Sequence, residues 1–137
     1  MKRTNLTDLA ANAEADAFAS LMDGGSIGIY DGEQPDTADD PLSGQKLGVT
    51  LGLSSPAFGR AAAGIIVANP IAAGTAIASL QRATWARVYS ADRKPVMDVS
   101  VGTRDAVIIL PTVSIPAGVT VTCSFFSHAV TKSTDGN

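Results

Sequence analysis

Residues 83–101 read Ala83-Thr-Trp-Ala-Arg-Val-Tyr-Ser90, then Ala91-Asp-Arg-Lys94, then Pro95-Val-Met-Asp-Val-Ser-Val101. The first and third segments are rich in the aromatic and β-branched residues that favour strands. The polar segment between them has the composition of a turn. This stretch therefore predicts a strand, a tight turn and a returning strand.

Strand signals continue on both sides of this stretch. Residues 26–30 alternate, with Ile27 and Ile29 on one face, and in residues 46–53 the side chains of Leu47, Val49, Leu51 and Leu53 face one way. Further short apolar runs occupy residues 62–68, 75–80, 106–110 and 119–130. The chain thus carries about eight short strands separated by Gly and Pro turns, with no helices between them. Because parallel βαβ units need crossover helices, the pattern predicts an antiparallel β-sandwich or jelly roll.

One helix is expected before the strands, over residues 5–22. Asn5 is placed to cap it, Asp8 complements its start, and Gly24-Gly25 end it. The apolar residues of this segment form one narrow stripe: Leu6, Leu9, Ala10, Ala13, Ala17 and Leu21. The stripe can dock on the chain's own sheet or on another subunit. The predicted organisation is a helical arm (1–24), a β-domain (25–130) and a flexible polar tail (131–137).

Composition and charge suggest contacts with other chains. The 137 residues are 45% hydrophobic but only 5% aromatic, which predicts a thin core that neighbouring chains help to stabilise. Residues 1–40 hold nine acids against two bases, a net of −7, whereas residues 41–137 hold eight bases against four acids, a net of +4. The asymmetry suggests complementary contacts between copies or with a partner. Alternatively, the acids simply solvate the helix and the loop after it.

Several functional classes lack their sequence signals. Nucleic-acid binding is not expected, because no basic patch with interleaved aromatic residues occurs. Neither a signal peptide nor a membrane span is expected, because no long apolar run follows the initial Met-Lys-Arg. The single cysteine, Cys123, excludes an intrachain disulfide. It is interpreted as a buried structural thiol, with a reactive thiol as the alternative.

Catalytic and metal-binding motifs are absent from the sequence as well. There is no nucleophile elbow and no phosphate-binding loop, and the order of acids over residues 31–40 does not match a calcium loop. His128 is the only histidine and is interpreted as a strand residue. We therefore predict a protein that is not an enzyme and uses no cofactor or metal. A small hydrolase using His128 and an acid is the remaining catalytic alternative.

Trp85 is the only tryptophan, and alternation places it on one strand face with Ala83 and Arg87. It can belong to the core, stack on a sugar, or anchor a subunit contact. Phe125 and Phe126 are adjacent and should point to opposite faces of the last strand, which suggests burial on both faces. The residues predicted to contact a partner are Lys2, Arg3, Leu6, Leu9, Trp85 and Arg87.

Six segments, in this order, resemble a group of small virion proteins of tailed bacteriophages. They are Gly25-Ser-Ile-Gly-Ile-Tyr-Asp-Gly-Glu-Gln-Pro-Asp36, Leu47-Gly-Val-Thr-Leu-Gly-Leu53, Ser54-Ser-Pro-Ala-Phe-Gly59, Thr84-Trp-Ala-Arg-Val-Tyr-Ser-Ala-Asp92, Asp98-Val-Ser-Val-Gly102 and Ile115-Pro-Ala-Gly-Val-Thr-Val121. Each segment alone has low specificity, and the resemblance as a whole covers about residues 25–126.

The resemblance implies a jelly-roll cement, or decoration, protein. Such a protein binds the outer surface of the phage capsid as a homodimer or homotrimer and stabilises the head by bridging major capsid subunits. It would be assembled in the host cytoplasm and located on the virion, without contacts to nucleic acid or membrane. The alternative is a β-module of a tail or fibre that binds host glycan, with Trp85 and Tyr89 as stacking groups.

Overall fold

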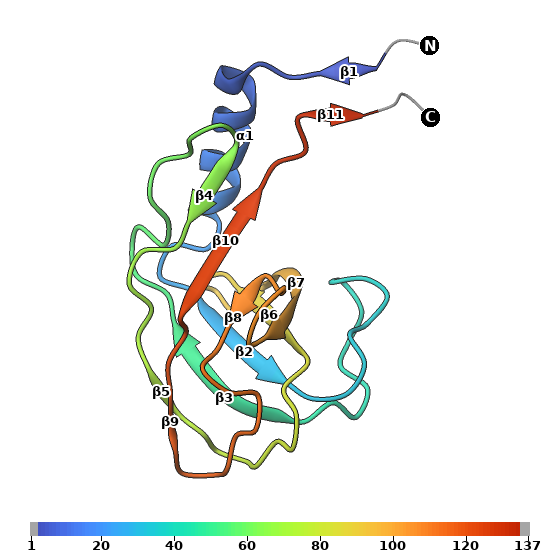
Figure 1. The fold of residues 1–137 in the computed structure, drawn as a ribbon, viewed down its shortest axis with the longest axis vertical. Coiled ribbons are helices and arrows are strands. Elements are labelled where there is room, and N and C mark those ends of the chain that lie inside the picture. The colour runs from blue at the N-terminus through green and yellow to red at the C-terminus, as the bar shows by residue number, and fades with distance from the viewer. Residues whose placement is uncertain (1–2, 135–137) are drawn as a thin grey trace.

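The structure, a computed structural model, describes residues 3–134, and within them it is mainly β with one helix near the N-terminus (Figure 1). The predicted fold class is confirmed. The elements are β1 (Thr4–Asn5), α1 (Asp8–Ser20), β2 (Ser26–Tyr30), β3 (Leu47–Gly52), β4 (Ile65–Val67), β5 (Gly74–Thr75), β6 (Trp85–Tyr89), β7 (Pro95–Gly102), β8 (Ile108–Ile109), β9 (Thr120–Val121), β10 (Phe125–Ala129) and β11 (Ser133–Thr134).

Seven strands form the main sheet in the order β3-β2-β6-β7-β8-β10-β4. The β6–β7 pair is the hairpin predicted from residues 83–101. All neighbours are antiparallel except β7 and β8, which run parallel with Val101 opposite Ile108. The sequence predicted antiparallel pairing here, and that detail is wrong. The chain doubles back over residues 103–107, where Asp105 has a φ of 53°, and so enters β8 in the direction of β7.

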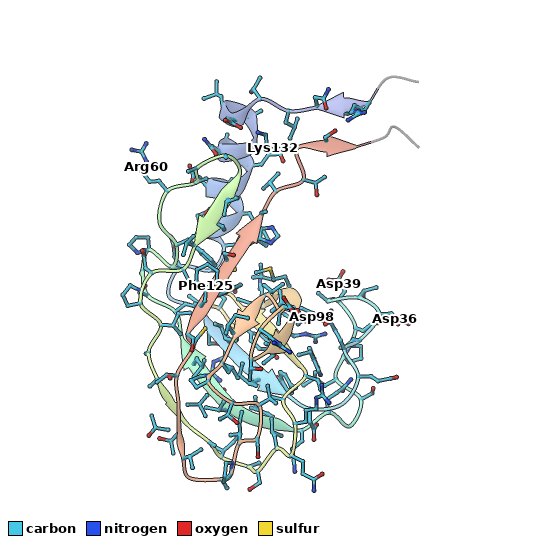
Figure 2. The ribbon with its side chains drawn as sticks, in the orientation of Figure 1. Asp36, Asp39, Arg60, Asp98, Phe125 and Lys132 are labelled. Atoms are coloured by element: carbon cyan, nitrogen blue, oxygen red, sulfur yellow. The ribbon has the colours of Figure 1, made fainter. Side chains whose placement is uncertain are left out.

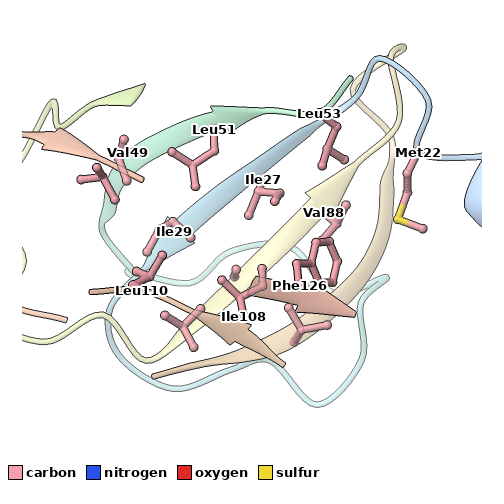
Figure 3. Close-up of a cluster of buried hydrophobic side chains, with 14 of the residues drawn as sticks. Met22, Ile27, Ile29, Val49, Leu51, Leu53, Val88, Ile108, Leu110 and Phe126 are labelled. Atoms are coloured by element: carbon pink, nitrogen blue, oxygen red, sulfur yellow. The ribbon is translucent and has the colours of Figure 1, made fainter. Parts of the chain in front are cut away.

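The sheet bends around a single apolar core (Figure 3). Ile27 and Ile29 of β2, with Leu51 of β3, are fully buried on its inner face. Ile108 of β8 and Phe126 of β10 fill the core from the other end of the sheet. Two distant parts of one sheet therefore face each other as the layers of a sandwich do. The small β5–β9 sheet and α1 add to its covering.

The helix starts later than predicted. Thr7 is the N-cap, and its Oγ1 accepts a hydrogen bond from the Ala10 backbone N–H at 3.1 Å. Asn5 is not the cap, because it is paired with Ser133 in the β1–β11 ribbon. The hydroxyl of Thr7 satisfies one of the backbone donors left unpaired in the first helical turn.

The helix also buries a different face from the predicted one. Its buried residues are Ala11, Ala15 and Ala19. The rotation is fixed by two polar contacts one turn apart: the side-chain oxygens of Asn12 and Asp16 accept hydrogen bonds from the backbone N–H groups of Gly64 and Ala61, each at 2.8 Å. The helix therefore docks on its own chain, next to β4.

Both ends of the described chain meet in a two-stranded ribbon. Thr4 of β1 lies opposite Thr134 of β11, so Ser133–Thr134 are paired rather than part of a frayed tail. The ribbon is joined to the helix start by a hydrogen bond from the Leu6 N–H to the Lys132 carbonyl and by the Lys132–Asp8 ion pair. Figure 1 shows it extending away from the core.

The two adjacent phenylalanines of β10 give a test of the core. Phe126 is 1% exposed and packs edge-to-face on Phe58 with ring centroids 5.2 Å apart, whereas Phe125 is 50% exposed. We expect Phe126→Ala to lower the free energy of unfolding by about 3–5 kcal/mol, because it leaves a cavity. Phe125→Ala is the matched control and should cost less than about 1 kcal/mol. Equal losses in urea unfolding would contradict this description of the core.

Candidate functional site

A cluster of large polar and aromatic side chains covers the outer face of β2, β6 and β7. Trp85 stacks on Tyr30 with ring centroids 4.7 Å apart and an interplanar angle of 17°. Arg87 lies 5.5 Å from the centre of the Trp85 ring and forms a two-point ion pair with Asp98. Its Nε and Nη2 donate to the two carboxylate oxygens at 2.7 and 3.0 Å.

The acidic loop, residues 31–46, folds back over this cluster and is held by it. Trp85 Nε1 donates to the Asp31 carbonyl at 3.0 Å, and Arg87 Nη1 donates to the Asp40 carbonyl at 2.8 Å. Thr84 Oγ1 donates to the Gly32 carbonyl at 2.7 Å. The loop is therefore a tethered cover for the sheet, although many of its side chains are exposed as predicted.

Trp85 and Arg87, which were predicted to contact a partner, lie instead beneath the acidic loop of their own chain. They are 1% and 3% exposed beneath their own chain. The side chain of Arg87 retains its charge, because hydrogen bonding to Asp98 raises its pKa despite burial, which lowers it. The signal that could have revealed this was the register of the predicted hairpin. A turn over residues 91–94 places Arg87 opposite Asp98, as the structure does.

Most of the exposed large apolar side chains lie elsewhere, on two separate surfaces of the chain. Five of them lie on α1 or just after it and on the β4–β10 strand pair, which we call the apolar end: Leu9, Leu21, Ile65, Val67 and Phe125. Leu9 is 82% exposed. In Figure 1, α1, β4 and β10 lie together on the side of the molecule that carries the terminal ribbon, and Figure 2 labels Phe125 on β10.

The apolar end has a simple structural origin. The β4–β10 pair has Ile66 opposite His128 on the face that α1 covers. On the opposite face, Ile65 lies opposite Ala129 and Val67 opposite Ser127, and Ile65 and Val67 are each 45% exposed. The pair is therefore apolar on both faces and covered on one. Such a face is typical of a protein–protein contact.

The helix contributes a second uncovered stripe. Leu9, Ala13, Ala17 and Leu21 recur every four residues and are exposed, so they lie along one outer face. The predicted contact residues Leu6, half-buried, and Arg3, exposed, lie beside the helix start. Lys2 lies outside the described residues. The structure thus places Arg3, Leu6 and Leu9 together and separates them from Trp85 and Arg87.

The groups considered for catalysis are isolated from one another. The ring of His128 packs on Phe18 with centroids 4.9 Å apart, and burial lowers its pKa. No hydrogen bond joins this ring to another group among residues 3–134. Cys123 is half-buried, burial raises the pKa of its thiol, and its Sγ donates to the Phe125 carbonyl at 3.4 Å.

In the described part of the chain, no three His, Cys, Asp or Glu side chains converge as a metal site would require. Nor does any helix in residues 3–134 have the length and apolar character needed to cross a membrane. Comparison with protein-family models, with curated proteins and with solved structures finds no match.

The buried ion pair should be important for stability. Asp98→Ala leaves the Arg87 charge buried without its carboxylate, and we expect it to lower the free energy of unfolding by about 3–5 kcal/mol. The other ion pair, Lys132–Asp8, is partly exposed, so Lys132→Ala should cost about 0–1 kcal/mol. Chemical denaturation of both variants measures the difference. A loss below about 1 kcal/mol for Asp98→Ala would show that Arg87 finds another partner or solvent.

His128 should make stability depend on pH. Its pKa is lower in the folded chain than in the unfolded chain, so only the unfolded chain gains a proton as the pH first falls below the ordinary histidine pKa. The free energy of unfolding should therefore fall between about pH 7.5 and about pH 5.5. We expect a smaller fall in His128→Gln, measured by urea unfolding at both pH values. An identical fall would mean that other groups cause it.

Proposed function

We propose that this protein is a structural component of a tailed-bacteriophage head. It binds the outer surface of the capsid shell as a homo-oligomer and stabilises the shell by bridging major capsid subunits. The apolar end is the observation that supports binding to another protein, and the sequence resemblance to tailed-phage virion proteins supports the choice of partner. A folded domain that leaves both a helix stripe and a sheet face uncovered has surface available for burial against another protein.

The terminal ribbon, formed by β1 and β11, is a second feature that supports the proposal. β1 and β11 are two residues each, and a two-stranded ribbon of this size is marginal in water by itself. It extends from the helix start beside Leu9 and is tethered there by the Lys132–Asp8 pair. A strand pair in this position is well placed to add to a neighbouring sheet through main-chain hydrogen bonds.

The charge distribution fits contacts between unlike surfaces. α1 carries Asp8, Glu14 and Asp16 and no basic residue. In Figure 2 the labelled acids Asp36 and Asp39 of the acidic loop lie on the side opposite Arg60. Like-charged helix faces would repel each other in a symmetric helix–helix dimer, so we assign the helix stripe to the capsid protein. A stable contact of this kind buries about 800 Å² on each partner.

The test is binding to phage heads emptied of DNA. We expect the purified chain to sediment with heads in a fixed stoichiometric ratio. The double variant Leu9→Gln, Leu21→Gln should bind at least about tenfold more weakly, because it removes the two largest apolar side chains of the proposed helix-stripe contact. Both side chains are exposed, so the melting temperature should remain close to that of the wild-type protein.

Ile77→Gln is the matched control for this experiment. Ile77 is 71% exposed and comes two residues after β5, a strand that lies far from α1 in Figure 1, so its replacement should leave head binding unchanged. Binding of the wild-type protein to host cells but not to heads would contradict the proposed function. Binding of the double variant at the wild-type level would contradict the assignment of the contact to the helix stripe.

The alternative function, a tail or fibre module that binds host glycan, requires Trp85 and Tyr89 to stack on the sugar, and only one of these two side chains is accessible. Trp85 is covered by the acidic loop and is not available to a sugar. Tyr89 remains half-buried at the end of β6. We therefore favour the head protein.

A further inference from the structure

A groove of about 620 Å³ lies on the outer surface where β2, β3 and the β6–β7 turn meet. Its lining includes four hydroxyl side chains besides that of Tyr30: Ser26, Thr50, Tyr89 and Ser90. Among the described residues that line it, Arg93 is the one that carries a charge, and Asp92 and Lys94 line a different depression beside α1. The groove therefore combines hydroxyl groups, an aromatic ring and a single positive charge.

The two tyrosines of the groove are held by unusual backbone features. The β2–β3 register shifts at Ile29/Tyr30, and the β6–β7 register shifts at Val88/Tyr89. Such irregularities re-aim side chains and are frequent next to functional sites. The Tyr30 and Tyr89 hydroxyls are 2.8 Å apart. Burial and this hydrogen bond raise the pKa of Tyr30, so its hydroxyl stays protonated.

Gly28 makes room for this pair. A Cβ atom at position 28 would lie 2.9 Å from the Tyr30 ring and 3.1 Å from its hydroxyl. The absence of a side chain lets the Tyr30 ring lie close over β2 with Trp85 on its other side. The tyrosine pair is thus fixed before any ligand arrives, which lowers the entropic cost of binding.

The backbone of Arg93 adopts a conformation that is unfavourable for any residue with a side chain. Its φ is 63°, in the left-handed region where glycine is preferred, and its N–H closes the turn on the Ser90 carbonyl at 2.9 Å. A non-glycine residue here costs on the order of 1 kcal/mol. Glycine would relieve the cost but would remove the only charge of the groove. The strain is explained if the guanidinium has a ligand to bind.

We propose that this groove binds an acidic saccharide. The sugar ring lies against Tyr89, its hydroxyl groups exchange hydrogen bonds with the hydroxyl side chains, and its carboxylate pairs with Arg93. A guanidinium recognises a carboxylate through two parallel hydrogen bonds, and tyrosine offers an apolar face with a polar tip. The site does not depend on the proposed head-binding function, because it lies on β2, β3 and the β6–β7 turn rather than at the apolar end.

The experiment is an NMR titration of the full chain with a hyaluronan tetrasaccharide, which carries glucuronate. Chitotetraose, which is neutral, is the matched ligand. We expect saturable shifts at the amides of the groove, and an affinity for the acidic sugar at least about tenfold above that for chitotetraose. Arg93→Gly should lose that tenfold preference while its melting temperature stays the same or rises, because glycine relieves the left-handed backbone.

Arg82→Ala is the control variant, since Arg82 is exposed and does not line the groove. It should bind the acidic sugar as the wild-type protein does. The proposal is overturned by any of three results: no saturable shift up to about 10 mM sugar, equal affinity for chitotetraose, or wild-type binding by Arg93→Gly. Loss of binding in Arg82→Ala would likewise overturn it, because it would indicate general attraction of an anion to a basic surface.

Discussion

The buried charge of Arg87 constrains the centre of this fold. A guanidinium removed from water must have its donors satisfied, and here Asp98 accepts two of the hydrogen bonds and the Asp40 carbonyl accepts a third. The first partner fixes the register of β6 against β7, and the second holds the acidic loop over the sheet. Once the loop is closed, Trp85 and Tyr30 are covered as well. One ion pair thus links the hairpin, the loop and the aromatic stack.

The sequence predicted those features that depend on local pattern. Alternation located β2, β3, β6 and β7, and β-branched composition with Gly and Pro turns was sufficient for the mainly β class. Prediction from the sequence failed for features that are set by contacts between residues distant in the chain. The helix face was chosen by apolar periodicity, but the rotation of α1 is set by Asn12 and Asp16 bonding to the backbone near β4. No periodicity encodes these bonds, because their acceptors appear in the sequence as polar surface residues.

The residues predicted to contact a partner include both exposed and buried side chains, for the same reason. Leu9 was selected for its place at the tip of an apolar stripe, and it is exposed beside the ribbon. Trp85 and Arg87 were selected because tryptophan and arginine are common in interfaces. The same residue types can also hold a loop of their own chain over a sheet face, as they do here. Residue type alone does not separate the two roles. The opposition of Arg87 and Asp98 across a hairpin would have done so, because a pair of opposite charges at one register position indicates an internal contact.

The thin core and the uncovered apolar end both follow from how α1 distributes its side chains between the inside and the outside. Helix α1 buries alanines, which allow close approach but remove little apolar area from water, while its leucines remain outside. A helix attached this weakly to its own sheet gains stability if a second surface covers Leu9 and Leu21. Any partner that binds only the folded chain adds its binding free energy to folding. Association through this end would therefore stabilise the part of the molecule that its own core supports least.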